Sequence, residues 1–133
     1  MKAVFADAAF YIAVINRRDE FHDAAKRLAV SILGQIVTTE YVLLEVGNFL
    51  ARSPDRCLFV ELVEALQADA DTTIISASPE WWRRGFAIYG RRADKHWSLT
   101  DCISFEVMQD KDLTEVLTGD HHFEQAGFTI LLK

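Results

Sequence analysis

The chain has 133 residues, of which 50% are apolar and 26% are charged. This length and balance are typical of one folded domain that builds its own core, and they exclude a disordered or collagen-like chain. The longest unbroken apolar run, from Ala8 to Ile15, covers eight residues, whereas a membrane-spanning helix needs about 18–20. The net charge of −6 at pH 7 argues against a general nucleic-acid binder.

The N-terminal segment and the two cysteines both indicate an intracellular protein. Asp7 interrupts the first apolar stretch and no small-residue cleavage site follows, so we expect no signal peptide. Cys57 and Cys102 form no Cys-x-x-Cys pair, and we expect both to be reduced thiols in the core. These features predict a cytoplasmic protein that does not associate with membranes.

Apolar runs of strand length alternate with segments of helical period along the chain. That alternation is typical of α/β proteins and predicts a central, mainly parallel sheet of four to five strands flanked by helices, in a three-layer sandwich. No stretch has the composition of a linker and no internal repeat is present, so we expect residues 1–133 to form a single domain. The expected strands cover residues 4–6, 36–38, 72–76, 115–118 and 128–132.

Capping residues, prolines and glycines mark the expected helix boundaries. Ser53-Pro54 and Ser78-Pro79 each have the pattern of an N-cap followed by proline in the first helical position. Gly90 is expected to stop the helix that Ser78 opens. The expected helices cover residues 7–15, 22–33, 39–52, 53–67, 78–89, 98–110 and 120–127, and residues 91–97 are expected to form a polar loop.

Two acidic residues follow strands that belong to the predicted parallel sheet. Asp7 comes directly after the first strand, and Asp120 follows the fourth strand across Thr118-Gly119. In an open parallel sheet, ligands bind beyond the carboxyl ends of the strands. These two carboxylates are therefore candidates for a site, although each also fits the simpler role of a helix N-cap.

Glu45 lies on an apolar face of the helix expected after residue 39. Its spacing places it beside Tyr41, Val42 and Phe49. A carboxylate among apolar side chains is costly unless something pairs with it. Glu45 is therefore a third candidate, with a salt bridge to an arginine or a tilted, partly exposed helix as the alternatives.

Asp101 has two compatible interpretations. The stretch from Ser98 to Asp101 fits the capping-box pattern, so the carboxylate can hold the start of its helix. Asp101 also shares a helix face with Ser104, Phe105 and Met108, which indicates a packed environment. Both roles can coexist.

If these four carboxylates converge, their charges repel, and they must bind protons or a cation. Mg²⁺ and Mn²⁺ prefer oxygen ligands and combine carboxylates with substrate phosphates. Such an ion activates water and neutralises charge in an in-line displacement at phosphorus. The predicted reaction class is phosphodiester hydrolysis.

The four carboxylates lie in motifs that occur in a fixed order. They are Val4-Phe5-Ala6-Asp7, Glu45-Val46-Gly47-Asn48, the stretch from Trp97 to Ser104 (Trp-Ser-Leu-Thr-Asp-Cys-Ile-Ser), and the stretch from Leu117 to Phe123 (Leu-Thr-Gly-Asp-His-His-Phe) followed by Gly127-Phe128. With these motifs, the whole chain resembles the PIN domain family, and specifically the VapC-type toxins of bacterial and archaeal toxin–antitoxin pairs.

The resemblance implies a PIN-like fold and a Mg²⁺- or Mn²⁺-dependent endoribonuclease. It also implies an RNA substrate, a homodimer and a cognate antitoxin that keeps the enzyme silent. A catalytically weak PIN-like module that binds RNA or a protein without cutting is the alternative. By resemblance, the catalytic, metal-binding carboxylates are Asp7, Glu45, Asp101 and Asp120.

One position departs from the family pattern. The family often carries Ser or Thr after its first Asp, whereas this chain has Ala8-Ala9. A hydroxyl that orients a ligand or a water molecule is therefore missing there. We expect the hydroxyls of Thr118 and Ser104 to contact the carboxylates and orient them, without binding the metal themselves.

Other residues invite functional interpretations. Arg91, Arg92 and Lys95 precede the third acidic motif and are candidates for RNA-phosphate contacts, with an ordinary solvated loop as the alternative. Trp81-Trp82 is expected to pack in the core with at least one ring, with a platform for bases or a contact with the antitoxin as the alternatives. His121-His122 adjoins Asp120, but the chain has no zinc-type ligand spacing, which argues against metal binding by these histidines.

Overall fold

The computed structural model describes residues 3–32, 34–52 and 54–133. Its centre is a five-stranded sheet with the order β3-β2-β1-β4-β5, in which every pair of neighbouring strands is parallel. The predicted α/β sandwich with a parallel central sheet is therefore confirmed. The strands are β1 (Val4–Ala6), β2 (Ile36–Thr39), β3 (Thr72–Ile75), β4 (Glu115–Leu117) and β5 (Thr129–Ile130).

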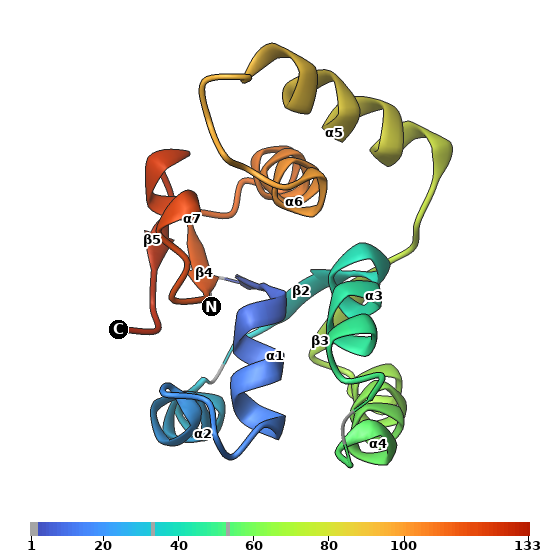
Figure 1. Cartoon of the computed structure of the whole chain (residues 1–133), viewed down its shortest axis with the longest axis vertical. Helices are drawn as coiled ribbons and strands as arrows, with labels where there is room; N and C mark the ends of the chain where they lie inside the picture. Colours follow the sequence, from blue (N-terminus) through green and yellow to red (C-terminus); the bar gives the residue numbers. More distant parts are fainter. Residues whose placement is uncertain (1–2, 33, 53) are drawn as a thin grey trace.

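Helices connect each strand to the next. Because crossovers between parallel strands are right-handed, the helices of the first two connections and those of the last two cover opposite faces of the sheet. In Figure 1, α1, α2 and α4 lie in the lower half of the view, whereas α5 and α6 lie above. The helices are α1 (Ala8–Ile15), α2 (His22–Ser31), α3 (Glu40–Phe49), α4 (Arg56–Ala68), α5 (Pro79–Arg91), α6 (Leu99–Asp110) and α7 (His121–Gln125). None of those helices combines the length and the apolarity that crossing a bilayer requires.

The strand order reverses at β1. From β1 the chain moves through β2 to β3, and it then crosses to the other side of β1 to form β4 and β5. In the register of the sheet, Phe5 pairs with Val37 on one side and with Val116 on the other. The carboxyl ends of β1 and β4 therefore border the point of reversal, which is where open parallel sheets bind ligands.

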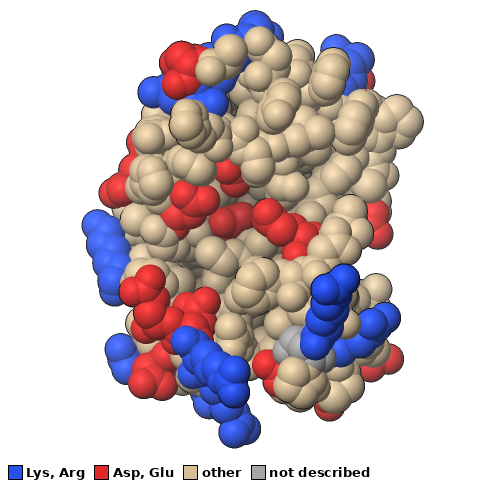
Figure 2. Space-filling view, in the orientation of Figure 1, with Lys and Arg blue, Asp and Glu red and all other residues tan. Residues whose placement is uncertain are grey.

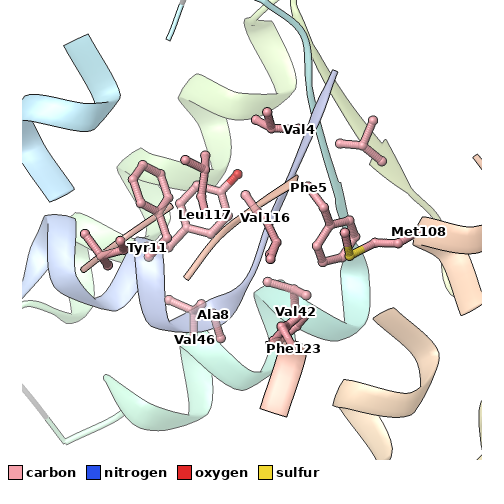
Figure 3. Close-up of a cluster of buried hydrophobic side chains, with 14 of the residues drawn as sticks. Val4, Phe5, Ala8, Tyr11, Val42, Val46, Met108, Val116, Leu117 and Phe123 are labelled. Atoms are coloured by element: carbon pink, nitrogen blue, oxygen red, sulfur yellow. The ribbon is translucent and has the colours of Figure 1, made fainter. Parts of the chain in front are cut away.

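The core lies between the sheet and the helices. Phe5 and Leu117 come from neighbouring strands, and Val42 from α3 and Phe123 from α7 join the same buried cluster; each of the four is 0% exposed. Figure 3 shows several of these side chains beside one another. Burial of each such side chain contributes about 1.5–3 kcal/mol, so the strand ends that carry the candidate site rest on fully buried core side chains.

Helices α5 and α6 approach each other closely at Gly85, which is the one buried residue of α5. A Cβ at this position would lie 2.2 Å from Ile103 Cγ1 and 3.1 Å from Ile103 Cα. The absence of a side chain is therefore what lets the two helices touch. Trp81 packs at the edge of the core, as expected for one ring of the pair, while Trp82 is 50% exposed and stacks on Phe86.

Several predicted boundaries are wrong. The expected N-cap Ser53 lies outside the described residues, and Pro54 does not begin the helix: α4 begins at Arg56, because its first helical hydrogen bonds run to the Asp55 carbonyl. Helix α5 continues through Gly90 to Arg91, since one glycine weakens a helix by only about 1 kcal/mol and does not end it. Other elements are shorter than expected: α2 ends at Ser31, α3 at Phe49 and α7 at Gln125, and β5 covers Thr129–Ile130.

The expectation of two core thiols holds for one cysteine. Cys102 is buried in α6, whereas Cys57 is exposed on α4. No described residue of α4 is fully buried, because this helix covers the edge of the sheet at β3 and leaves one side to solvent. Cys57 lies on that open side.

Candidate active site

A cavity of about 350 Å³ lies at the carboxyl ends of β1 and β4, and all four candidate carboxylates line it. Figure 2 shows acidic side chains gathered in a band across the middle of the view, with basic side chains toward the edges of the molecule. The fold therefore brings together residues that are far apart in the sequence. The lining comprises Asp7, Glu45, Asp101 and Asp120, together with Ala8, Ala9, Ile12, Phe49, His96, Ser98 and His122.

Asp7 occupies the N-cap position of α1, but its side chain makes no capping hydrogen bond in that helix. Capping alone therefore does not explain the carboxylate. The residue is 4% exposed, and this burial raises the pKa of Asp7 to about 7, with a further rise from the charge of Asp101. A buried acid whose pKa is raised in this way favours its protonated form when no cation is bound, and a cation stabilises its charged form.

Thr118 connects the ends of β1 and β4. Its hydroxyl, which is fully buried, donates to Asp7 Oδ2 at 3.0 Å and accepts from the Asp120 backbone N–H at 3.1 Å. This side chain contacts the carboxylate of Asp7 and the backbone of Asp120, and so lies where a supporting residue would be needed. It also supplies a hydroxyl beside Asp7 although Ala8 has none.

Asp120 combines the two roles considered for it. Its Oδ1 accepts from the His122 backbone N–H at 2.9 Å and so caps the short helix α7. The same side chain lines the cavity. The cap fixes the carboxylate at the cavity wall, so the structural role and a ligand role are compatible.

Asp101 likewise holds a helix start and lines the cavity. The capping box is complete: the Asp101 backbone N–H donates to Ser98 Oγ at 3.0 Å, and the Ser98 backbone N–H donates to Asp101 Oδ2 at 3.1 Å. Burial raises the pKa of Asp101, and the charge of Asp120 raises it further, while the Ser98 N–H and His122 oppose the rise.

Glu45 reaches the cavity from α3 and is half-buried. Burial raises its pKa, and the charges of Asp101 and Asp120 add to the rise. Among the residues that the structure describes, no arginine or lysine forms an ion pair with it, so the salt-bridge alternative fails. Its expected apolar surroundings are only partly right, because Phe49 is 60% exposed at the cavity rim.

His122 belongs to the site, contrary to the argument from zinc spacing. Its Nδ1 lies 3.2 Å from Asp101 Oδ2 and 3.4 Å from Asp120 Oδ1. Ligand atoms of these three residues all lie within 4.8 Å of one another. The available signal was the position of His122 two residues after a carboxylate that caps its helix, which keeps the two side chains together. His121 is exposed.

The donor set fits a divalent cation. Four carboxylates supply oxygen ligands of the kind that Mg²⁺ and Mn²⁺ prefer, and one imidazole lies beside two of them. The pKa values of Asp7, Glu45 and Asp101 are all raised, with mutual repulsion among the causes. A cation would relieve this repulsion, whereas without one the cavity must hold protons.

Two further expectations need correction. Ser104 does not support the carboxylates, because its hydroxyl is buried without a hydrogen-bond partner among the described residues. Arg91 lies in the last turn of α5 and not in a loop. The Arg92 side chain is paired with Asp94 at 3.0 and 3.1 Å, and neither arginine nor Lys95 lines the acidic cavity.

Comparison with known proteins gives consistent results. A family model for the PIN domain matches residues 4–129. The 23S rRNA-specific endonuclease VapC20 of Mycobacterium tuberculosis is 30% identical over 129 residues, which cover 94% of this chain and 95% of that protein. The crystal structure of M. tuberculosis VapC20, described as a sarcin–ricin loop cleaving toxin, superposes with a TM-score of 0.86 at 25% identity, over 95% of this chain and 96% of that one. A toxin–antitoxin complex from Klebsiella pneumoniae shares the fold, with a TM-score of 0.67 at 18% identity over 96% of this chain and 95% of that one.

Proposed function

The chain belongs to the PIN domain family, and we propose on that basis that it is a metal-dependent endoribonuclease and the toxin of a toxin–antitoxin pair. The observation that carries the proposal is the convergence of four carboxylates on one cavity, with no lysine or arginine among the described residues that line it. A module that only binds RNA or protein gains nothing from this repulsion, because like charges repel phosphates as well as one another.

The proposed ligands of the metal ion are Asp7, Glu45, Asp101 and Asp120, with His122 beside them. When bound, Mg²⁺ or Mn²⁺ polarises a phosphate oxygen and lowers the pKa of a water molecule. The chain itself holds the ligands in place: Thr118 orients the Asp7 carboxylate, and the capping hydrogen bonds of α6 and α7 fix Asp101 and Asp120. These contacts exist before any substrate arrives, which is the preorganisation that catalysis requires.

The proposed substrate is an RNA. The relative VapC20 is named for cleavage of 23S rRNA, and its crystal structure for cleavage of the sarcin–ricin loop. We therefore propose ribosomal RNA as the first substrate to test. Phosphate contacts are assigned to Arg91, Arg92 and Lys95, which lie on the α5–α6 connection or next to it.

We propose two protein partners in addition to RNA. One is a cognate antitoxin, since the solved structures with this fold include toxin–antitoxin complexes. The other is a second copy of the chain, as the family resemblance implies. An RNA substrate and a protein inhibitor of this kind place the activity in the cytoplasm.

The test is cleavage of total and ribosomal RNA by purified wild-type protein with Mg²⁺, with Mn²⁺ and with EDTA. We expect discrete cleavage that requires a divalent ion and that Asp7→Asn and Glu45→Gln each abolish. The matched controls are Asp71→Asn and Glu64→Gln, which change exposed acids away from the cavity and should leave cleavage intact.

Cleavage that persists in Asp7→Asn would indicate a contaminating nuclease and would remove the support for the proposal. If no RNA is cut with either ion while Mn²⁺ still raises the melting temperature of the wild type and not of Asp101→Asn, the chain is a metal-binding module without nuclease activity.

A further inference from the structure

A second cavity, of about 830 Å³, lies between α5 and the start of α6. We propose that it binds a nucleobase of the single-stranded RNA, next to the phosphate that is cleaved. This inference rests on the proposed nuclease function and adds a specificity-determining subsite to it. The volume falls within the roughly 300–1,000 Å³ that is usual for small-molecule sites.

The second cavity adjoins the acidic one. His96 and Ser98 line both of them. Ser98 is the N-cap of α6 and bonds to Asp101, so the wall between the two cavities is held by the same capping box that fixes a candidate metal ligand. If the phosphate of a nucleotide lies at the carboxylates, its base can therefore enter the second cavity next to them.

The second cavity offers aromatic faces that the core does not use. Phe86 and Tyr89 lie on α5 at a spacing of three residues, and they are 57% and 51% exposed. Trp82 stacks on Phe86, with ring centroids 6.1 Å apart and planes 10° from parallel. Exposed rings of this kind serve as stacking platforms for bases in proteins that bind single strands.

The charge at the second cavity also favours a nucleotide. Lys95 and Arg92 contribute positive charge to its lining, although the Arg92 guanidinium is paired with Asp94, and none of the described residues that line it is a carboxylate. The two cavities therefore differ in charge. The acidic cavity attracts cations, whereas the second cavity attracts the phosphates that flank a base. Trp97 is not available for stacking, because its indole N–H donates to Gln125 at 3.0 Å and the Arg92 guanidinium covers its ring.

The test compares the binding of two probes by fluorescence anisotropy, with Ca²⁺ in place of Mg²⁺. One probe is a short single-stranded oligoribonucleotide, and the other is an abasic chain of the same length and the same charge. We expect the wild type to bind the first about tenfold more tightly. The double variant Phe86→Ala/Tyr89→Ala should lose that preference, whereas its affinity for the abasic chain should not change.

The matched control is Leu58→Ala, which truncates an exposed apolar side chain on α4 and should keep the preference. All three changes are at exposed positions, and circular dichroism checks that the variants fold. Equal affinities of the wild type for both probes would overturn the inference. A change from dimer to monomer in Phe86→Ala/Tyr89→Ala, measured by light scattering, would assign this surface to a contact between copies and would also overturn it.

Cleavage by the same proteins separates this inference from the proposed function. Metal-dependent cleavage by the wild type with no preference for bases would retain the nuclease and reject the subsite. A preference for bases without cleavage under any divalent ion would retain the subsite and reject the nuclease. If both hold, the double variant should raise KM for RNA about tenfold and leave kcat nearly unchanged.

Discussion

The hydroxyl of Thr118 donates a hydrogen bond of 3.0 Å to Asp7 Oδ2, although the two residues are 111 positions apart in the sequence. This contact crosses the point where the strand order reverses, and both residues follow the ends of neighbouring strands. It fixes the orientation of the most deeply buried carboxylate of the cavity.

Replacement of Thr118 by Val tests this contact at nearly constant volume. The change leaves Asp7 without a side-chain donor and the Asp120 backbone N–H without its acceptor. We expect metal affinity and cleavage to fall about 10–100-fold and stability to fall by about 1–3 kcal/mol. Thr118→Ser keeps the hydroxyl and should retain most of the activity. Equal activity of the two variants would mean that the hydroxyl is not needed.

The raised pKa of Asp7 makes the metal-free protein less stable as the pH increases. The folded state holds this proton up to about pH 7, whereas the unfolded chain releases it near 3.8. Stability is therefore lost as pH rises between these values, because the folded state binds more protons. Asp7→Asn removes the titration, so its stability relative to wild type should increase by about 2–3 kcal/mol between pH 5 and pH 8.

Urea denaturation in EDTA at both pH values measures this difference. Asp71→Asn is the matched control, since it changes an exposed carboxylate and should show no such trend. A stability difference between Asp7→Asn and wild type that stays constant from pH 5 to pH 8 would contradict the predicted burial of a protonated Asp7.

Metal preference should depend on His122. Its Nδ1 lies close to carboxylate oxygens of both Asp101 and Asp120. Imidazole suits Mn²⁺ better than Mg²⁺, which favours oxygen ligands. We expect His122→Ala to weaken Mn²⁺ binding about tenfold and to affect Mg²⁺ less. Calorimetric titration of both ions, with the exposed His121→Ala as the control, checks this; equal losses for the two ions would exclude His122 as a selective ligand.

The close approach of α5 to α6 depends on Gly85. A methyl group at this position would meet Ile103 at 2.2 Å from Cγ1 and at 3.1 Å from the backbone. We expect Gly85→Ala to lower the free energy of unfolding by about 1–3 kcal/mol. Gly90→Ala is the control in the same helix, because nothing lies within 4 Å of its added Cβ, and it should stabilise the protein by up to about 1 kcal/mol. Thermal or urea unfolding of both variants measures the difference. Equal stability of the two variants would contradict the prediction, because it would mean that α5 and α6 accommodate a methyl group at Gly85 without cost.

The sequence predicts those parts of the candidate site that lie at the ends of strands or in local helix-capping patterns. Asp7 and Asp120 follow strands, and any open parallel sheet brings such ends to one edge. Asp101 was predictable because its capping box is a local pattern, and the structure contains both of its hydrogen bonds. For Glu45, helical spacing alone places a carboxylate on an apolar helix face, where its burial costs free energy unless a partner binds it.

Other features required the tertiary structure. The exposure of Cys57 and Phe49 depends on which neighbouring element covers their helices, and helical spacing does not specify that element. Helix α5 passes through Gly90 because the local cost of one glycine is small beside the packing of the whole helix. The absence of zinc-type ligand spacing argued against His122 as a metal ligand. Its contact with Asp101 joins α7 to α6, and spacing along the chain does not predict a contact between two helices.

By itself, the sequence determined the alternation of strands and helices, the strand ends that carry acids and the family to which the chain belongs, because these follow from local periodicity and from motifs. The tertiary structure alone decided that Asp7 is the carboxylate to which Thr118 donates, that His122 lies beside Asp101 and Asp120, and that an aromatic cavity adjoins the acidic one. Such contacts depend on the direction and packing of the crossovers, which place distant segments side by side and which the spacing of residues along the chain does not specify.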